Sequence, residues 1–237
     1  MTRRLTFTLA LAAVAMTLPL SATPAATPAA AQPATPADHP LLPAELETAW
    51  ALSAAPAHLR DGAAVYSMTP TGYVQTRPGT NAFTCLVNRR GGDVFPVCWD
   101  AEGTRTLMAV DVDVSRRRLA GAAPAALEAD VAAAYAEGRT RPPARPGVAY
   151  MLSPLRVRID ANGAATRSPA VPHAMFYAPH LTDADIGGAR TGVAFINRVG
   201  PDGMMIVPLG ASEREAIAVE TAPLVGRVER ALGVGSR

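Results

Sequence analysis

The chain has 237 residues, of which 49% are hydrophobic and 18% charged, and this composition excludes a mostly disordered protein. The 22 basic residues are all arginines, against 20 acidic residues. Because Arg3 and Arg4 lie in a segment expected to be removed, the remaining chain is formally neutral and lacks the positive charge typical of nucleic-acid-binding proteins. Beyond the N-terminus, no apolar run approaches the roughly 20 residues of a membrane-spanning helix.

Residues 1–31 have the pattern of a secretory signal peptide. Two arginines near the start precede an apolar segment at residues 5–20, and three alanines at 29–31 give a small-residue cleavage pattern. We expect cleavage there, with export to the periplasm or the medium and no membrane span afterwards. An uncleaved membrane anchor is the alternative.

The rest of the chain is expected to form one domain with additions at both ends. Residues 32–43 carry four prolines and predict an extended linker in which His39 is solvated. Residues 44–210 form the expected domain, and residues 211–237 a helical extension. About 190 foldable residues suffice for one full core.

A helix and two strands are predicted at the start of the domain. Residues 44–54 place Leu46 and Trp50 on one helical face, and prolines flank the segment. Trp50 is expected to anchor the core. Residues 63–68 and 72–76 are strand candidates, because turn-forming residues separate them.

Residues 81–99 predict a β-hairpin closed by a disulfide. Gly91-Gly92 separates two β-rich runs, and glycines tolerate the positive φ that a two-residue hairpin turn requires. This register sets Cys85 opposite Cys98 at a non-hydrogen-bonded site, where Cβ atoms approach most closely, and it also suits Pro96. An exported chain favours the disulfide, worth about 3 kcal/mol. A redox pair is the alternative, although no Cys-x-x-Cys is present.

Helices and strands alternate through the rest of the chain. A helical turn is expected at residues 182–185, where Thr182 and Asp185 make a capping box. Ser212 with Glu215 is another candidate capping box, which opens a C-terminal helix that Pro223 should divide in two. The other predicted helices and strands are 101–109, 124–137, 148–153, 155–160, 170–178, 192–199 and 204–209. The pattern predicts a single α+β domain with a mainly antiparallel sheet, a disulfide-stapled hairpin and flanking helices.

The chain lacks the common catalytic and nucleotide-binding motifs. Asp111 and Asp113 open a segment like a calcium loop, as do Asp183 and Asp185, but neither segment has an acidic residue at the twelfth position. We interpret both acidic pairs as helix caps or exposed turns. The sequence therefore predicts no metal and no cofactor.

His173 is the strongest candidate for chemistry. It and His180 bracket an apolar run, and a spacing of seven in a strand places them on opposite faces, which disfavours one shared metal. Beside Tyr150 or Tyr177, His173 could act as a general acid or base near pH 7. The alternative is a structural histidine held by one hydrogen bond at the end of a strand.

Five short strings resemble a group of exported bacterial proteins of unknown function. The resemblance spans roughly residues 45–209, implies no activity, and marks Tyr150, Ser153 and His173 as positions that match its motifs. This chain departs from the group in its tight turn between the cysteines, in reading Val-Pro-His where relatives often read His-Pro-His, and in lacking a Trp-Ser-Asp-Gly stretch. The strings are Glu47–Pro56, Asn81–Val87, Pro96–Cys98, Ala149–Ser153 and Pro172–Tyr177.

Three functional hypotheses follow. The first is a non-enzymatic exported domain that binds a small molecule or an envelope component near Tyr150, His173 and Tyr177. The second is an exported hydrolase-like enzyme with His173 as base and Ser153 as nucleophile, which requires a carboxylate such as Glu47, Asp100 or Asp160 beside the histidine. The third is a structural part of an envelope assembly, which predicts a large exposed apolar patch.

Overall fold

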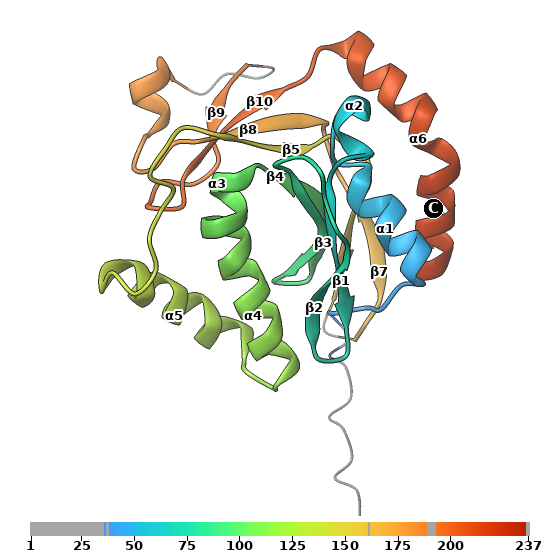
Figure 1. Ribbon diagram of the computed structural model, residues 1–237, viewed down its shortest axis with the longest axis horizontal. Coiled ribbons are helices and arrows are strands. Elements are labelled where there is room, and N and C mark those ends of the chain that lie inside the picture. The colour runs from blue at the N-terminus through green and yellow to red at the C-terminus, as the bar shows by residue number, and fades with distance from the viewer. Residues whose placement is uncertain (1–35, 37, 161, 189–192, 236–237) are drawn as a thin grey trace, which may run out of the picture. The chain divides into compact units, whose positions relative to one another are not determined.

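The computed structural model describes residues 36, 38–160, 162–188 and 193–235, all within one compact unit (Figure 1). The expected signal peptide lies outside the described residues. Ten strands form one sheet: β1 (Ala64–Thr69), β2 (Gly72–Arg77), β3 (Thr84–Arg90), β4 (Asp93–Trp99), β5 (Val148–Met151), β6 (Arg156–Ile159), β7 (Ala165–Ser168), β8 (His173–Tyr177), β9 (Phe195–Ile196) and β10 (Met204–Pro208).

The strand order confirms the expected α+β class. The sheet runs β2-β1-β3-β4-β5-β8-β10-β9, while β6 pairs with β4 and carries β7. β1 and β3 run parallel, and the other described pairs are antiparallel. The helical segments are α1 (Ala44–Leu52), α2 (Ala57–Arg60), α3 (Ala101–Gly103), the π-helical η1 (Thr104–Met108), α4 (Ala109–Leu119), α5 (Pro124–Ala136), the 3₁₀ turn η2 (Asp183–Ile186) and α6 (Ala211–Leu232).

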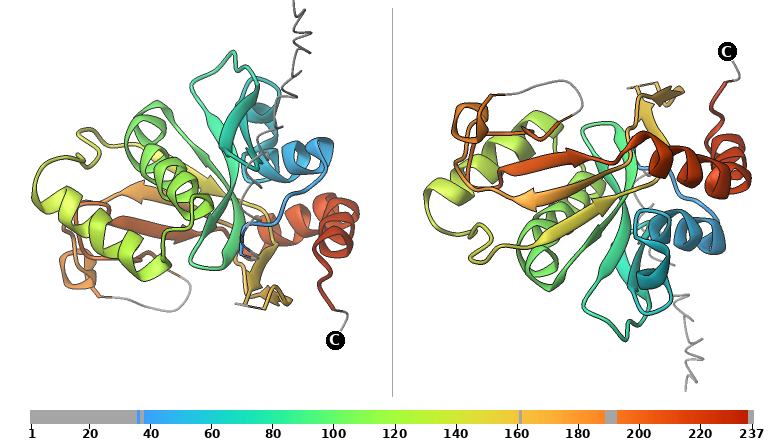
Figure 2. Two further views of the ribbon diagram at one scale, coloured as in Figure 1. Left: turned by 90° about the horizontal axis from the view of Figure 1, so that it is seen from below. Right: turned by 90° about the horizontal axis from the view of Figure 1, so that it is seen from above.

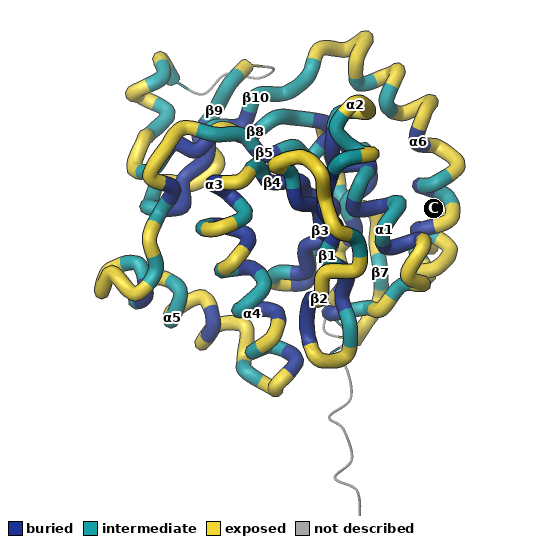
Figure 3. Tube along the Cα trace, viewed as in Figure 1, coloured by how far each residue is buried: buried dark blue, intermediate teal, exposed yellow. Residues whose placement is uncertain are grey.

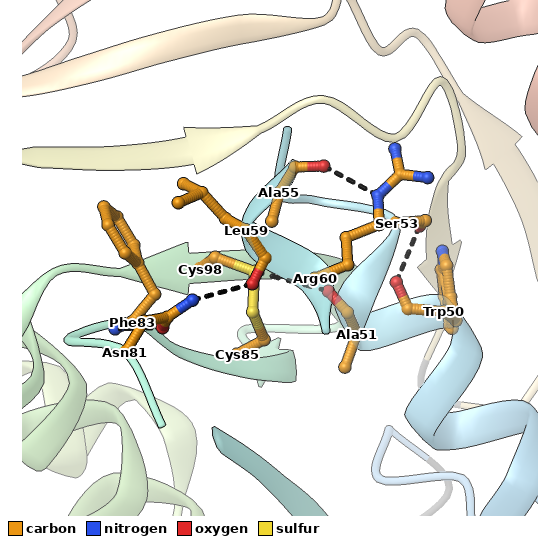
Figure 4. The surroundings of a disulfide bond; sticks show 10 residues. All are labelled: Trp50, Ala51, Ser53, Ala55, Leu59, Arg60, Asn81, Phe83, Cys85 and Cys98. Atoms are coloured by element: carbon orange, nitrogen blue, oxygen red, sulfur yellow. Dashed lines mark hydrogen bonds between the residues drawn. A yellow bond between two sulfur atoms is a disulfide. The ribbon is translucent and has the colours of Figure 1, made fainter. Parts of the chain in front are cut away.

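The β3–β4 hairpin has the predicted register. Cys85 pairs with Cys98, and the φ angles of Gly91 and Gly92 are 62° and 82°, as a primed turn requires. The two cysteines form a disulfide, with their Cα atoms 4.0 Å apart. Figure 4 shows that the bond lies against α1, where Cys98 Sγ is 3.5 Å from the carbonyl oxygen of Ala51. The disulfide therefore staples the hairpin beneath the first helix.

Side chains that alternate along the strands divide the core between the two faces of the sheet. One cluster packs under α1 and α6 and contains Trp50, which is fully buried as expected. The other cluster packs under η1 and α4 and contains Trp99 and Tyr177. Figure 2 shows α1 and α6 on one side of the central strands and α4 and α5 on the other.

α6 corrects two expectations about the C-terminus. It is one helix of 22 residues with Pro223 inside it, and it begins at Ala211 with Gly210 as the N-cap, so Ser212 does not cap it. Pro223 removes the N–H that would bond to the carbonyl of Val219, but both residues lie on the exposed side, where water can satisfy that carbonyl. The buried residues Val225 and Val228 hold the second half of the helix against the domain, whereas residues 211–220 are exposed or half-buried (Figure 3).

The acidic pair at Asp111 and Asp113 is another correction. The helix predicted at 101–109 continues through η1 and α4 to Leu119, so Asp111 is a mid-helix residue rather than a cap or an exposed turn. Its side chain is buried against the sheet, where it accepts a hydrogen bond from Asn88 Nδ2 at 2.6 Å. The other acidic pair behaves as expected, because Asp185 completes a capping box with Thr182.

His39 is buried, so the expectation that it is solvated is wrong. The neighbouring Asp38 accepts a hydrogen bond from Arg118 at 3.1 Å, and the carbonyl of Pro40 accepts one from Arg89 Nε at 2.9 Å. Arg89 is itself buried in β3, so its guanidinium needs acceptors in its surroundings, and the Pro40 carbonyl is one of them. Among the described parts of the chain, no helix is long and apolar enough to cross a membrane.

Candidate functional site

A cavity of about 770 Å³ lies on the α4 side of the sheet. β4 pairs with β5 at one end, through Cys98 and Tyr150, and with β6 at the other, through Asp93 and Arg158. Between these two pairings, residues 152–155 leave the sheet. The sheet therefore branches at β4, with β5, β8 and β10 on one branch and β6 on the other. Residues from both branches line the cavity.

The cavity walls are largely apolar. Because side chains alternate in β8, His173 and Met175 line the cavity while Phe176 lies on the other face and is exposed. The same alternation in β10 places Met204 and Ile206 on the wall. The apolar lining includes Phe95, Val97, Trp99, Met151, Met175 and Ile206. Ligand sites typically enclose about 300–1,000 Å³ with such walls and a few polar groups.

One polar group of residues lies where the cavity meets α4 and α5. Asn88 donates to Asp111, which also bonds to Arg90 at 3.1 Å. Burial raises the pKa of Asp111, although Arg90 opposes the shift. Burial also raises the pKa of Tyr135, which lines the cavity, to about 12, so its hydroxyl stays protonated. Asn88 Oδ1 is buried without a hydrogen-bond partner among the described residues.

A second polar group surrounds His173. The ring Nδ1 lies 2.5 Å from the carbonyl oxygen of Val171, and burial lowers the pKa of the imidazole while Arg156 contributes in the same direction. The histidine is therefore neutral at pH 7, with Nδ1–H donating to that carbonyl. Arg156 bonds to Asp93 at 2.6 Å, and its guanidinium carbon lies 5.5 Å from the ring centroid of Phe95.

The structure brings Ser153 and His173 to the same cavity but gives the histidine no carboxylate. Ser153 is buried, and its Oγ accepts a 3.4 Å hydrogen bond from Leu155 N. The three carboxylates considered from the sequence are engaged elsewhere: Glu47 binds Arg89, Asp100 accepts from Tyr177 and two backbone amides, and Asp160 caps its own turn. Within the described ranges, the hydrogen-bond partner of His173 is a backbone carbonyl.

Tyr150 and Tyr177 do not line this cavity. Tyr150 pairs across the strands with Cys98, on the α1 face of the sheet, and its ring lies 5.8 Å from that of Phe83. Tyr177 lies on the α4 face, but its hydroxyl donates to Asp100 Oδ1 at 2.7 Å. Its ring fills the space beside Gly103, where an added Cβ would collide with it. The two tyrosines therefore pack against opposite faces of the sheet, outside the cavity lining.

Sequence reasoning missed most of the cavity lining. Asn88, Asp111 and Arg156 come from β3, α4 and β6, and no local motif links them. The hairpin register sets Asn88 opposite Phe95, and this pairing is the signal in the sequence that a polar residue shares a face with the aromatic wall. Among the residues that the structure describes, no cluster of three or more His, Cys, Asp or Glu could hold a metal.

Comparisons with known proteins identify no relative. No protein-family model matches the chain, and neither the curated proteins nor the solved structures give a significant match. The resemblance to exported bacterial proteins therefore stays an expectation from the sequence.

Proposed function

We propose that the protein is exported and binds a small, largely apolar molecule in the cavity without transforming it. The observation that carries the proposal is an apolar cavity of about 770 Å³ on one face of the sheet. The Cys85–Cys98 disulfide and the signal-like residues 1–31 support export, because disulfides persist in oxidising compartments. The ligand is a free small molecule or a component of the cell envelope.

Hydrolysis is the second candidate, because Ser153 and His173 line the same cavity. A serine nucleophile needs a base that a third group orients, usually a carboxylate. His173 is instead held by the Val171 carbonyl, an acceptor that carries no charge to stabilise an imidazolium. This arrangement supports binding over catalysis.

The binding proposal is tested with the uncharged fluorescent probe N-phenyl-1-naphthylamine and a pair of neighbouring variants. Ile206→Trp places an indole in the cavity, whereas Val207→Trp places the same group on the opposite face of β10. Excluding roughly 50 Å² of apolar contact costs about 1.3 kcal/mol, so Ile206→Trp should weaken probe binding about tenfold. Val207→Trp should leave it unchanged.

Two results would contradict the proposal. Equal probe affinity in both tryptophan variants would place the probe outside the cavity. Turnover of p-nitrophenyl acetate that disappears in both His173→Ala and Ser153→Ala would favour the hydrolase instead.

A further inference from the structure

We propose that the ligand is an apolar molecule with a carboxylate, and that Arg156 and Arg214 bind this carboxylate at the His173 end of the cavity. The inference rests on the proposed binding function and specifies the chemical class of the ligand.

The charges that line the cavity do not balance. Two of its four arginines neutralise its two aspartates, since Arg90 lies 3.1 Å from Asp111 and Arg198 lies 3.1 Å from Asp202. The arginines left over are Arg156 and Arg214, and both line the cavity. With four arginines and two aspartates among its lining residues, the apolar cavity favours an anion over a cation.

The acidic partner of Arg156 is Asp93, which does not line the cavity and also pairs with Arg158. Asp93 lies 2.6 Å from Arg156 and 3.1 Å from Arg158, so one carboxylate serves two guanidinium groups. The Arg156 side chain is 37% exposed, so part of it stays accessible beside the Asp93 contact. A ligand carboxylate in the cavity would supply a second anionic partner for this guanidinium.

Arg214 stands at the same end of the cavity. It lies in the first turn of α6, where its Nη1 donates to the carbonyl of Leu209 at 3.0 Å. Leu209 N bonds to the carbonyl of Pro172 at 3.0 Å, which places this segment beside His173. Within the described part of the chain, no acidic group lies within 4.0 Å of Arg214.

His173 does not supply the positive charge at neutral pH, because its Nδ1–H is committed to the Val171 carbonyl and its pKa is lowered by burial. The two arginines remain charged at any pH of interest. Guanidinium groups present paired N–H donors that match the two oxygens of a carboxylate. A carboxylic acid with an apolar body therefore fits both the charge and the walls of the cavity.

The test compares acids with alcohols of the same carbon skeleton. Decanoate and decan-1-ol, and 4-phenylbutyrate and 4-phenylbutan-1-ol, compete with N-phenyl-1-naphthylamine at pH 8 in the oxidised protein. We expect each acid to bind about tenfold more tightly than its alcohol, because charge-assisted hydrogen bonds exceed neutral ones. Arg156→Gln and Arg214→Gln should each remove most of this preference while the alcohols and the probe bind unchanged.

Arg158→Gln is the matched control, because Arg158 shares Asp93 with Arg156 but does not line the cavity. It should keep the full preference for the acids. Alcohols that compete as well as acids, or variants at 156 and 214 that retain the preference, would overturn the carboxylate site and leave the binding function standing. If neither the probe nor decanoate binds in direct titration calorimetry, both proposals fail.

Discussion

Breaking the buried ion pair between Arg89 and Glu47 should strongly lower the free energy of unfolding of the domain. Arg89 is 0% exposed, and its guanidinium donates to both oxygens of Glu47, at 2.8 and 2.6 Å. It also donates to the carbonyls of Pro40 and Val87 at 2.9 and 2.7 Å. Replacing it with methionine leaves the Glu47 carboxylate buried with one 3.3 Å hydrogen bond from Met68 N.

Arg89→Met should lower the free energy of unfolding by about 3–5 kcal/mol, because it strands a buried charge. In a domain of this size that corresponds to a fall in Tm of about 10 °C. Urea unfolding followed by circular dichroism measures the loss. The double variant Glu47→Met with Arg89→Met should recover most of it, since no unpaired charge remains.

The result that would refute this reasoning is a loss below about 1 kcal/mol for the single variant. A double variant as unstable as Arg89→Met would show that the unpaired carboxylate is not the cause. Both variants should still bind N-phenyl-1-naphthylamine at 10 °C, because Arg89 and Glu47 do not line the large cavity.

Three further predictions concern single features of the fold. Replacing Cys85 and Cys98 by alanine should cost about 3 kcal/mol in urea unfolding, because a loop closure is lost from the unfolded chain. Burial lowers the pKa of His39, so the unfolded chain binds more protons below about pH 6.5 and the unfolding free energy should fall between pH 7 and 5. His39→Gln should reduce this dependence in urea titrations at several pH values, and His173, whose pKa burial also lowers, should account for the rest. Tyr177→Phe should cost about 1 kcal/mol in thermal unfolding, since it removes the hydrogen bond to Asp100.

Local chemistry determined several elements of this protein directly. Two adjacent glycines allow the positive φ angles of the hairpin turn, and the alternation of strand pairs then sets Cys85 opposite Cys98. The capping box of Thr182 and Asp185 is equally local, because its donors and acceptors lie within one turn. The α+β class followed from the alternation of such segments.

Other features depended on packing between distant segments. Pro223 would interrupt an isolated helix, but Val225 and Val228 hold α6 against the core while the unpaired carbonyl stays on the exposed side. His39 is buried because its neighbours supply acceptors to Arg118 and to Arg89, a contact between residues far apart in sequence.

The candidate site belongs to this second class. From the sequence, His173 and Ser153 were recognisable as chemical groups, and in the structure both line the cavity. The excess of arginines over acids in the cavity lining, which includes Arg156 and Arg214, could not be predicted from the sequence. It depends on which arginines form ion pairs with Asp111, Asp202 and other acids in the folded protein. Hydrogen-bonded turns and caps are decided by neighbours along the chain, whereas a cavity and its net charge are decided only when distant strands and helices come together.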